Sequence, residues 1–215
     1  MREELFIKCG ERELLEREYK ILMQLNQVEA RKKQELSRLF PIVYAYKEEG
    51  ESATIKIEYI QGKPLNHIIN ASKAQWIEWM IEVARGMTML HSLRPAVIWC
   101  DCKPENLMID TQNNIHLVDF NGACFLEKQP LNKTYGTLRY AAPEQRNGER
   151  LDQRVDIYAF GKTFLAMPMK RSWFSIHKIL RQCIQKEKEK RIQTSGELLY
   201  RLKKLEQSKL RIDDV

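Results

Sequence analysis

Two different spacings of apolar residues follow one another along the chain. Residues 5–9 form a short apolar run, and apolar positions then recur at helical spacing through residues 14–25. Residues 42–46 and 53–60 alternate between apolar and polar types, which is typical of a β-hairpin because successive strand side chains point to opposite faces. From residue 76 to residue 90, apolar side chains return at helical spacing. The pattern predicts a strand, a helix and a hairpin, followed by a mainly helical second part.

Gly62 and Pro64 mark the change between these two parts. Both residue types interrupt regular structure, and Ser72 just beyond them is a suitable N-cap for the helix that follows. We therefore divide the chain into residues 1–62, rich in strands, and residues 63–215, mainly helical. At 215 residues the chain is long enough for one sizeable core or for two small lobes that share a cleft.

The chain is moderately basic, and its excess of positive charge lies late in the sequence. It contains 36 Lys and Arg against 29 Asp and Glu, which gives a net charge of +7. Residues 170–211 hold thirteen of the basic residues and only four Glu. Such a surface could meet nucleic acid, acidic lipid or an acidic substrate, but solvated helix surfaces have this composition more often. We favour the solvated surface, and nucleic-acid binding is not expected.

The cysteines and the apolar segments indicate the cell compartment. The five cysteines are odd in number, form no C-x-x-C pair and have no nearby His that would complete a zinc site. Reduced thiols in the cytosol are the simplest interpretation. No apolar run approaches the roughly 18 residues that span a bilayer, and the charged first four residues do not resemble a signal peptide. We expect a cytoplasmic protein without a membrane span. The five cysteines are Cys9, Cys100, Cys102, Cys124 and Cys183.

A second predicted hairpin carries the residues with the clearest chemistry. Residues 107–109 and 115–118 are apolar, and residues 110–114 between them are typical of a turn. Two short strands joined by this turn would bring Asn106 and Asp119 side by side. Carboxamide and carboxylate oxygens are hard ligands, which suit Mg²⁺ that carries the phosphates of a substrate.

Asp101 and Lys103 lie on the loop that enters this hairpin. Asp101 is placed to take a proton from an attacking hydroxyl, and Lys103 is close enough to neutralise charge on a transferred phosphoryl group. A proton acceptor, a cation and two metal ligands on a single hairpin favour phosphoryl transfer. The alternative is a charged loop between two core strands that has this pattern by chance.

At these residues the chain resembles the eukaryotic-type (Hanks-type) Ser/Thr protein kinase family. D-x-K-P-E-N over residues 101–106, with D-F at residues 119–120, is similar to the catalytic loop and metal-binding loop of that family. The resemblance implies an α+β, bilobal fold with a reduced, β-rich N-terminal lobe over residues 1–62. It implies a mainly helical C-terminal lobe over residues 63–215. It also implies ATP and Mg²⁺ as cofactors and a protein substrate.

The resemblance extends to the first helix of the chain. By resemblance, Lys8 is the strand lysine that holds the α- and β-phosphates of ATP. Its partner is Glu18, because Glu-x-x-Ile-Leu starting at this residue matches the register of the family. Glu16 is the alternative partner.

The end of the first hairpin resembles the hinge that binds adenine in the family. Residues 58–65 match the pattern E-Y-x-x-G-x-x-L. The resemblance implies that the backbone C=O of Glu58 and N–H of Ile60 hold adenine, with Ile57 as gatekeeper. Met108 would pack under the adenine ring.

Residues 136–144 are similar to the G-T-x-x-Y-x-A-P-E segment of protein kinases, which sugar, choline and aminoglycoside kinases lack. The resemblance implies that Thr137 contacts both Asp101 and Lys103. It also implies a buried ion pair between Glu144 and Arg191. Asp156, in a D-x-x-x-x-G pattern, would brace the backbone of the catalytic loop. Because of the G-T-x-x-Y-x-A-P-E segment, a small-molecule phosphotransferase is disfavoured.

Several positions depart from the pattern of the family. No G-x-G-x-x-G motif occurs, so the strands and loop that normally cover the phosphates are not found in this sequence. Phe6 stands where the family has a small Ala and could crowd the nucleotide. Trp99 replaces a His as a packing residue, and Cys100 replaces an Arg that grips activation-loop phosphate. Asn121 replaces the first glycine of D-F-G, at a turn where Asn tolerates positive φ.

These departures favour a second function. The alternative to an active kinase is a pseudokinase, a kinase-like binding or regulatory module with weak or no nucleotide turnover. Either form could have a protein partner that completes or covers the N-terminal lobe. A basic nucleic-acid-binding protein is supported by charge alone.

Overall fold

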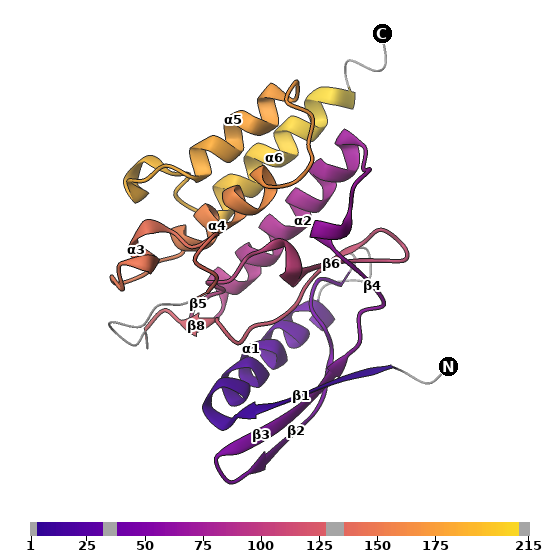
Figure 1. Cartoon of the computed structure of the whole chain (residues 1–215), viewed down its shortest axis with the longest axis vertical. Coiled ribbons are helices and arrows are strands. Elements are labelled where there is room, and N and C mark those ends of the chain that lie inside the picture. The colour runs from indigo at the N-terminus through magenta and orange to yellow at the C-terminus, as the bar shows by residue number, and fades with distance from the viewer. Residues whose placement is uncertain (1–3, 32–37, 128–135, 211–215) are drawn as a thin grey trace.

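The computed structural model places a small β-sheet at one end of the molecule and a group of helices at the other (Figure 1). It describes residues 4–31, 38–127 and 136–210. The chain passes from the sheet into the helical part through residues 59–64, and no later strand of the described residues pairs with this sheet.

The N-terminal sheet contains three strands in the order β1–β3–β2, all antiparallel. They are β1 (Leu5–Glu11), β2 (Val43–Glu49) and β3 (Ser52–Glu58). In the central strand β3, Ala53, Ile55 and Ile57 are buried while the residues between them are more exposed. This alternation gives the sheet one apolar face.

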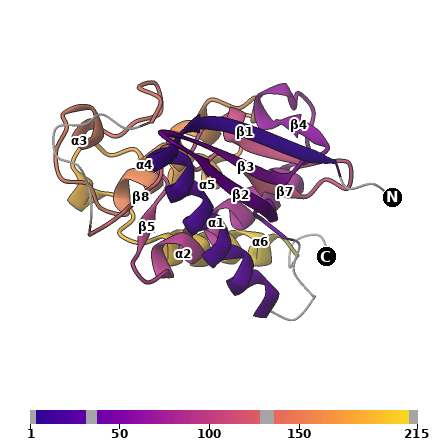
Figure 2. The same cartoon turned by 90° about the horizontal axis from the view of Figure 1, so that it is seen from below.

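Helix α1 (Arg12–Arg31) covers that apolar face (Figure 2). It begins directly where β1 ends, so no loop separates Lys8 from the helix that carries Glu18. Its apolar stripe includes Ile21, Leu22 and Leu25, all fully buried. The short connection fixes the position of α1 against the strand.

The second part is built around α2 (Lys73–Ser92), which is buried along most of its length. The hydroxyl of Ser72 accepts a hydrogen bond from the backbone N–H of Gln75 at 3.1 Å, so the predicted N-cap is confirmed. Helix α6 (Ser195–Leu210) lies alongside α2 (Figure 1). The remaining helices are α3 (Pro143–Arg146), α4 (Arg154–Leu165) and α5 (Phe174–Cys183).

Short strands line the junction between the two parts. One antiparallel sheet has the order β4–β6–β7 and contains the predicted second hairpin. Another pairs β5 with β8. Three-residue 3₁₀ helices occur at Leu65–His67, Pro104–Asn106 and Lys188–Lys190. The strands are β4 (Gly62–Pro64), β5 (Val97–Ile98), β6 (Leu107–Asp110), β7 (Ile115–Leu117) and β8 (Cys124–Phe125).

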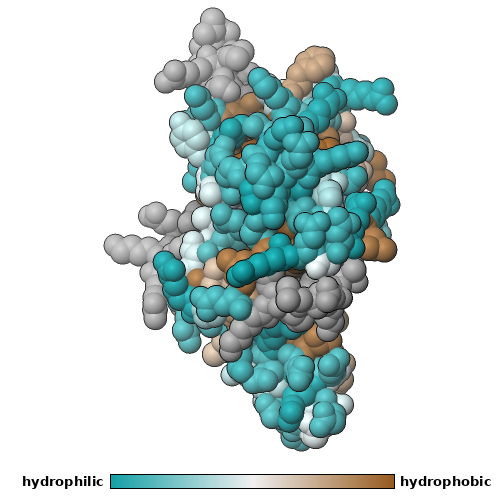
Figure 3. All heavy atoms as spheres, turned by 90° about the vertical axis from the view of Figure 1, so that its left-hand side faces the viewer, coloured by the Kyte–Doolittle hydropathy of each residue, from teal (hydrophilic) through white to brown (hydrophobic). Residues whose placement is uncertain are grey.

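One hydrophobic cluster joins both parts of the molecule. It includes Leu15 and Ile55 from the N-terminal part, Leu107 from the hairpin, and Trp76 and Phe160 from the helices. The face in Figure 3 is mostly hydrophilic in its upper half, where the C-terminal helices lie. In the part of the chain that the structure describes, no helix is both long enough and apolar enough to cross a membrane.

Candidate active site

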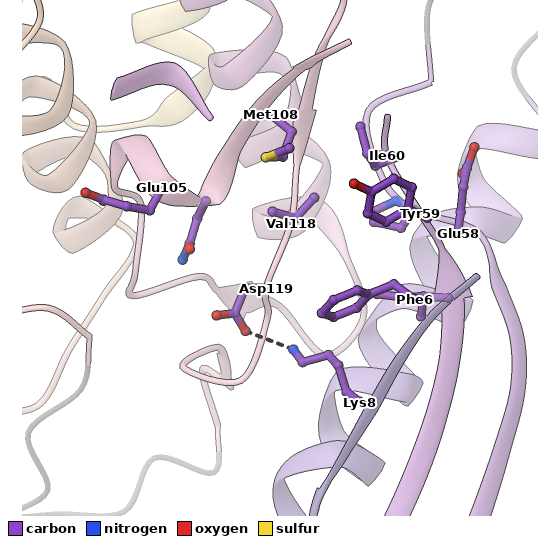
Figure 4. A pocket seen from close by; sticks show the side chains of 12 residues that line it. Phe6, Lys8, Glu58, Tyr59, Ile60, Glu105, Met108, Val118 and Asp119 are labelled. Atoms are coloured by element: carbon purple, nitrogen blue, oxygen red, sulfur yellow. Dashed lines mark hydrogen bonds and ion pairs between the residues drawn. The ribbon is translucent and has the colours of Figure 1, made fainter. Parts of the chain in front are cut away.

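A pocket of about 300 Å³ lies between the N-terminal sheet and the β6–β7 hairpin (Figure 4). Its volume falls at the lower end of the range for small-molecule sites. Most of the predicted site residues line it, although they come from distant parts of the sequence. The lining residues are Phe6, Lys8, Pro41, Ile57, Glu58, Tyr59, Ile60, Glu105, Asn106, Met108, Val118 and Asp119.

Lys8 links the two sides of the pocket. Its Nζ donates to both carboxylate oxygens of Glu18, at 2.8 and 2.7 Å, and to Oδ1 of Asp119 at 3.0 Å. Glu18 is fully buried and also accepts from the backbone N–H of Phe120 at 3.0 Å. The predicted Lys8–Glu18 pair is therefore confirmed, whereas the alternative Glu16 forms an ion pair with Lys20.

Asn106 and Asp119 face the same pocket, as the hairpin predicted. The carboxamide nitrogen of Asn106 donates to the backbone oxygen and Oδ2 of Asp101, at 3.0 and 3.1 Å. Among the residues that the structure describes, Oδ1 of Asn106 receives no hydrogen bond. The Asp119 side chain is 40% exposed. An amide oxygen without a partner and an accessible carboxylate fit a hard cation such as Mg²⁺.

The pair is not a metal site that the protein could complete alone. Within the described ranges, no three His, Cys, Asp or Glu side chains are grouped so that they could hold a metal ion. Mg²⁺ commonly takes one or two protein ligands and completes its shell with water and phosphate oxygens. Asn106 and Asp119 are suited to that kind of shared coordination.

Asp101 is held in a network with Lys103 and Thr137. Its Oδ1 accepts from the backbone N–H and the hydroxyl of Thr137, both at 2.8 Å. Its Oδ2 lies 2.8 Å from Nζ of Lys103, which also donates to the Thr137 hydroxyl at 3.0 Å. The predicted contacts of Thr137 are confirmed. Gly136 permits them, because a Cβ there would lie 2.2 Å from the backbone oxygen of Cys100.

Asp156 fixes the backbone of the loop that carries Asp101. From the first turn of α4, its carboxylate accepts from the backbone N–H groups of Trp99 and Cys100, each at 2.8 Å. It also lies 2.9 Å from Nε2 of His91. Cys100 has φ of 65°, a left-handed conformation that costs energy for a non-glycine residue. The predicted bracing role is confirmed, and His91 is a contact that the sequence pattern missed.

Trp99 does more than the packing role predicted for it. Its ring stacks on Phe120 with a centroid distance of 5.6 Å, and its Nε1–H donates to the backbone oxygen of Asp119 at 2.9 Å. A buried indole needs an acceptor, and this requirement was the signal that could have predicted the bond. Trp99 thereby ties the loop that carries Asp101 to the loop that carries Asp119.

Asn121 does not adopt the positive φ that its residue type tolerates. The left-handed residue of this loop is Asp119, with φ of 63°, and Asn121 is not among the residues with positive φ. A glycine is therefore not required at position 121. Instead, the backbone oxygen of Asn121 accepts from Nη2 of Arg17 on α1 at 3.0 Å, a contact that sequence reasoning missed.

The residues predicted to bind adenine lie at the pocket, but their hydrogen bonds to a base stay predictions. Glu58, Ile60 and Met108 all line the pocket. The Glu58 side chain turns to Arg38 and to the backbone N–H of Ile42. Of the described residues, none provides a backbone acceptor for the N–H of Ile60. A backbone donor therefore remains at the pocket wall.

Glu144 and Arg191 form the predicted buried ion pair. Nη1 and Nη2 of Arg191 donate to the two carboxylate oxygens at 2.6 and 2.8 Å. The guanidinium carbon also lies 4.9 Å from the centroid of the Tyr158 ring. The pair anchors α3, and with it the segment that holds Thr137, to the C-terminal helices.

The thiols that flank Asp101 are not nucleophiles. A hydrogen bond between the Cys100 and Cys124 thiols, together with burial, raises the pKa of the Cys100 thiol. Burial raises the pKa of the Cys102 thiol, whose environment also contains Asp156 and Asp101. A raised pKa keeps a thiol protonated and unreactive at neutral pH.

A two-part molecule with a strand lysine paired to a helix glutamate, above a hairpin that carries Asn106 and Asp119, defines the protein kinase class of folds. Residues 6–212 match the sequence model of the family described as the protein kinase domain. The chain belongs to the protein kinase family, and the predicted α+β, bilobal kinase fold is confirmed.

Similar proteins are found in several groups of organisms. A probable serine/threonine-protein kinase of Clostridium acetobutylicum is 24% identical over 208 residues, 80% of this chain and 31% of that protein. A probable serine/threonine-protein kinase of Arabidopsis thaliana is 31% identical over 137 residues, 59% of this chain and 32% of that protein. Matches to a mimivirus kinase and a Dictyostelium discoideum kinase cover only 7% and 6% of those proteins.

The fold is also similar to a solved kinase structure. PK-1, the kinase of Cydia pomonella granulovirus, matches with a TM-score of 0.75 at 12% sequence identity. The match covers 93% of this chain and 85% of the viral one. At this identity the likeness shows the fold alone.

Proposed function

We propose that this protein transfers the γ-phosphoryl group of ATP, bound with Mg²⁺, to a serine or threonine hydroxyl of a protein substrate. One observation carries the proposal: Nζ of Lys8 lies 3.0 Å from Asp119 in a pocket that Asn106 also lines. A cation, a carboxylate and an amide oxygen are gathered where the phosphates of a nucleotide and its metal require them.

The pocket residues would hold the cofactors. Lys8 would bind the α- and β-phosphates, kept in place by Glu18, while Asn106 and Asp119 would hold Mg²⁺. Glu58, Ile60 and Met108 would hold the base, the first two through backbone groups and Met108 through its apolar side chain. When bound, Mg²⁺-ATP supplies the phosphoryl group and part of the positive charge that stabilises its transfer.

The catalytic loop would act on the substrate hydroxyl. Asp101 would orient this hydroxyl and accept its proton on a carboxylate oxygen. Lys103, 2.8 Å from Asp101, would neutralise negative charge on the moving phosphoryl group. Thr137 would hold both side chains in position through its hydrogen bonds to them.

A protein substrate is supported by the segment that carries Thr137. Leu138, the next residue, is 63% exposed beside the catalytic network, so an extended peptide could reach Asp101 along this segment. We further expect a protein segment, from a partner or from elsewhere in a longer chain, to cover the outer edge of β1. In the described residues, β1 pairs only with β3.

A second candidate is a kinase-like module that binds a partner without turnover. It is favoured by the state of Asp101, since both carboxylate oxygens already have partners in Thr137, Lys103 and Asn106. To accept a proton from the substrate hydroxyl, Asp101 would have to give up one of these contacts. Transfer of the labelled γ-phosphoryl group of ATP to a protein substrate separates the two candidates.

Thermal unfolding in the presence of Mg²⁺-ATP tests the proposed cofactor site. A ligand at about 100 times its Kd stabilises the native state by about 2.7 kcal/mol, roughly a 5–10 °C rise in Tm for a chain of this size. We expect this rise in the wild type and its loss in Asp119→Ala. Glu51→Ala, which removes an exposed carboxylate far from the pocket, is the matched control and should rise like the wild type. A wild type that shows no rise, or an Asp119→Ala variant that rises equally, would contradict the proposal.

A further inference from the structure

Phe6 is a large apolar side chain left 46% exposed at the entrance to the pocket. Single exposed apolar residues are common and need no explanation. This one is different because it lies on the pocket wall, in the same strand as the lysine that faces Asp119. Its exposed ring is therefore available to a ligand.

The strand places the ring in register with Lys8. Side chains two positions apart share one face of a strand, so Phe6 and Lys8 project to the same side, about 7 Å apart along β1. Their partners across the sheet, Ile57 and Ile55, are buried on that same side. Figure 4 shows the ring beside Lys8, reaching from β1 toward Val118. A molecule bound to Lys8 through its charged end would extend along the strand to the ring.

The wall of the pocket that faces Phe6 is also apolar. Met108 and Val118 come from the hairpin side of the pocket, and Ile57 and Ile60 add further apolar lining. A volume of about 300 Å³ remains with the Phe6 ring in the pocket wall, so the ring does not fill the pocket. A flat ligand would have one face toward Phe6 and the other toward Met108 and Val118.

We propose that Phe6 is the stacking residue for the base of the bound nucleotide, so that its aromatic ring lies against one face of the base. The inference rests on the proposed nucleotide site and adds the residue that recognises the base. Stacking on an aromatic ring favours any flat heteroaromatic group, because every base has a π-face. A phosphate chain without a base would gain nothing from it.

Calorimetric titration with two probes, Mg²⁺-ATP and Mg²⁺-tripolyphosphate, tests the inference at constant ionic strength. We expect Phe6→Ala to weaken Mg²⁺-ATP binding about tenfold, within the range for loss of one base–aromatic stack. Tripolyphosphate binding should change less than about twofold, because its contacts to Lys8 and the metal remain. Phe6→Trp, which keeps a flat ring, should bind Mg²⁺-ATP about as well as the wild type.

Ile7→Ala is the matched control. Ile7 is the adjacent residue, 53% exposed and on the opposite face of the strand, so its truncation should leave both affinities unchanged. Tm values without ligand show whether each variant is folded.

Three results would overturn the inference. Phe6→Ala could bind Mg²⁺-ATP as tightly as the wild type or more tightly, which would make the ring neutral or obstructive. It could also lose affinity equally for both probes, which would make its effect structural. Wild-type protein that binds neither probe would refute the proposed nucleotide site itself. This result can be told apart from the two results for Phe6→Ala, because it is seen in the wild type alone.

Discussion

At the scale of single residues, the site depends on which atoms of each side chain form hydrogen bonds within the protein and which stay accessible from the pocket. Asn106 uses its nitrogen for two bonds to Asp101 and keeps its oxygen toward the pocket. Asp119 gives one oxygen to Lys8 and remains 40% exposed. Structural bonds thus orient each group and still leave an oxygen for a cation, which is how a site is organised before its ligand arrives.

The different burial of the five cysteines predicts which thiols will react with an alkylating reagent. In native protein at pH 8, iodoacetamide should modify Cys9, which is exposed, and leave the four buried thiols unmodified. The thiolate is the reactive form, so a raised pKa lowers its fraction. Burial raises the pKa of Cys183 to about 12, so this thiol should stay protonated even at pH 9.5. Intact-mass spectrometry measures the number of modifications.

Unfolded protein is the control for this experiment, because all five thiols should react once burial is lost. Modification of a second thiol in native protein, at a rate similar to that of Cys9, would show that the burial described for these residues is wrong.

Residue roles were predictable where a motif fixes several positions at once. The contacts of Asp101, Thr137 and Asp156 followed from the resemblance to the kinase family that those motifs carry. The role of Trp99 did not, because its partner is a backbone oxygen and backbone atoms leave no mark in a sequence. The conformation of Asn121 did not follow from the sequence either, since its residue type permits positive φ but does not require it.

At the scale of elements, ion pairs and caps join segments that have few other contacts. Helix α3 is only four residues long and could not be stable alone. Arg191 binds Glu144 of this helix and also donates to the backbone oxygens of Gln185, Arg154 and Lys186. Since the Arg191 side chain is fully buried, the Glu144 carboxylate is its essential counter-charge.

Removing one partner of this pair should be costly. We expect Arg191→Met to lower the free energy of unfolding by about 3–5 kcal/mol, because Glu144 is left buried without its counter-charge. Urea denaturation measures the change. Lys203→Met, which removes an exposed positive charge from α6, is the control and should cost less than about 0.5 kcal/mol.

The double variant Glu144→Leu with Arg191→Met distinguishes lost attraction from an uncompensated charge. It should be more stable than Arg191→Met alone, because no charged group is left buried. A double variant that loses the sum of the two single effects would contradict this description of the pair.

Element positions were predicted well where periodicity was long, as in α2, whose N-cap was also correct. The apolar run at residues 5–9 predicts a first strand that is too short, since β1 continues to Glu11. Pairing with Ser52 and Ala53 of β3 extends it, and such pairing depends on a distant segment that local pattern does not contain.

At the scale of the whole molecule, the site exists only where the two parts meet. Lys8 and Asp119 are 111 positions apart in the sequence, and Glu18 contacts both Lys8 and the backbone of Phe120. The hydrophobic cluster continues through this junction, so helix α1 and the hairpin are packed as one unit. A change that shifts α1 would therefore alter the position of Lys8 relative to Asp119.

The presence of a shared pocket followed from family resemblance, but its shape did not follow from the sequence. Its walls combine β1, the end of β3 and the β6–β7 hairpin, and their separation is set by packing between distant residues. This is why Phe6 was expected to crowd a nucleotide, although the structure leaves room beside its ring.

Transfer of the radiolabelled γ-phosphoryl group of ATP to a generic protein substrate, in the presence of Mg²⁺, tests the central claim most directly. We predict labelling by the wild type and by the surface control Glu149→Gln, with at least a 100-fold loss in Asp101→Asn, the usual scale for removing a general base. The Tm rise with Mg²⁺-ATP should persist in Asp101→Asn, because Asp101 is not a proposed cofactor ligand. Labelling that survives in Asp101→Asn, or a wild type that binds Mg²⁺-ATP and labels nothing, would contradict phosphoryl transfer at this site.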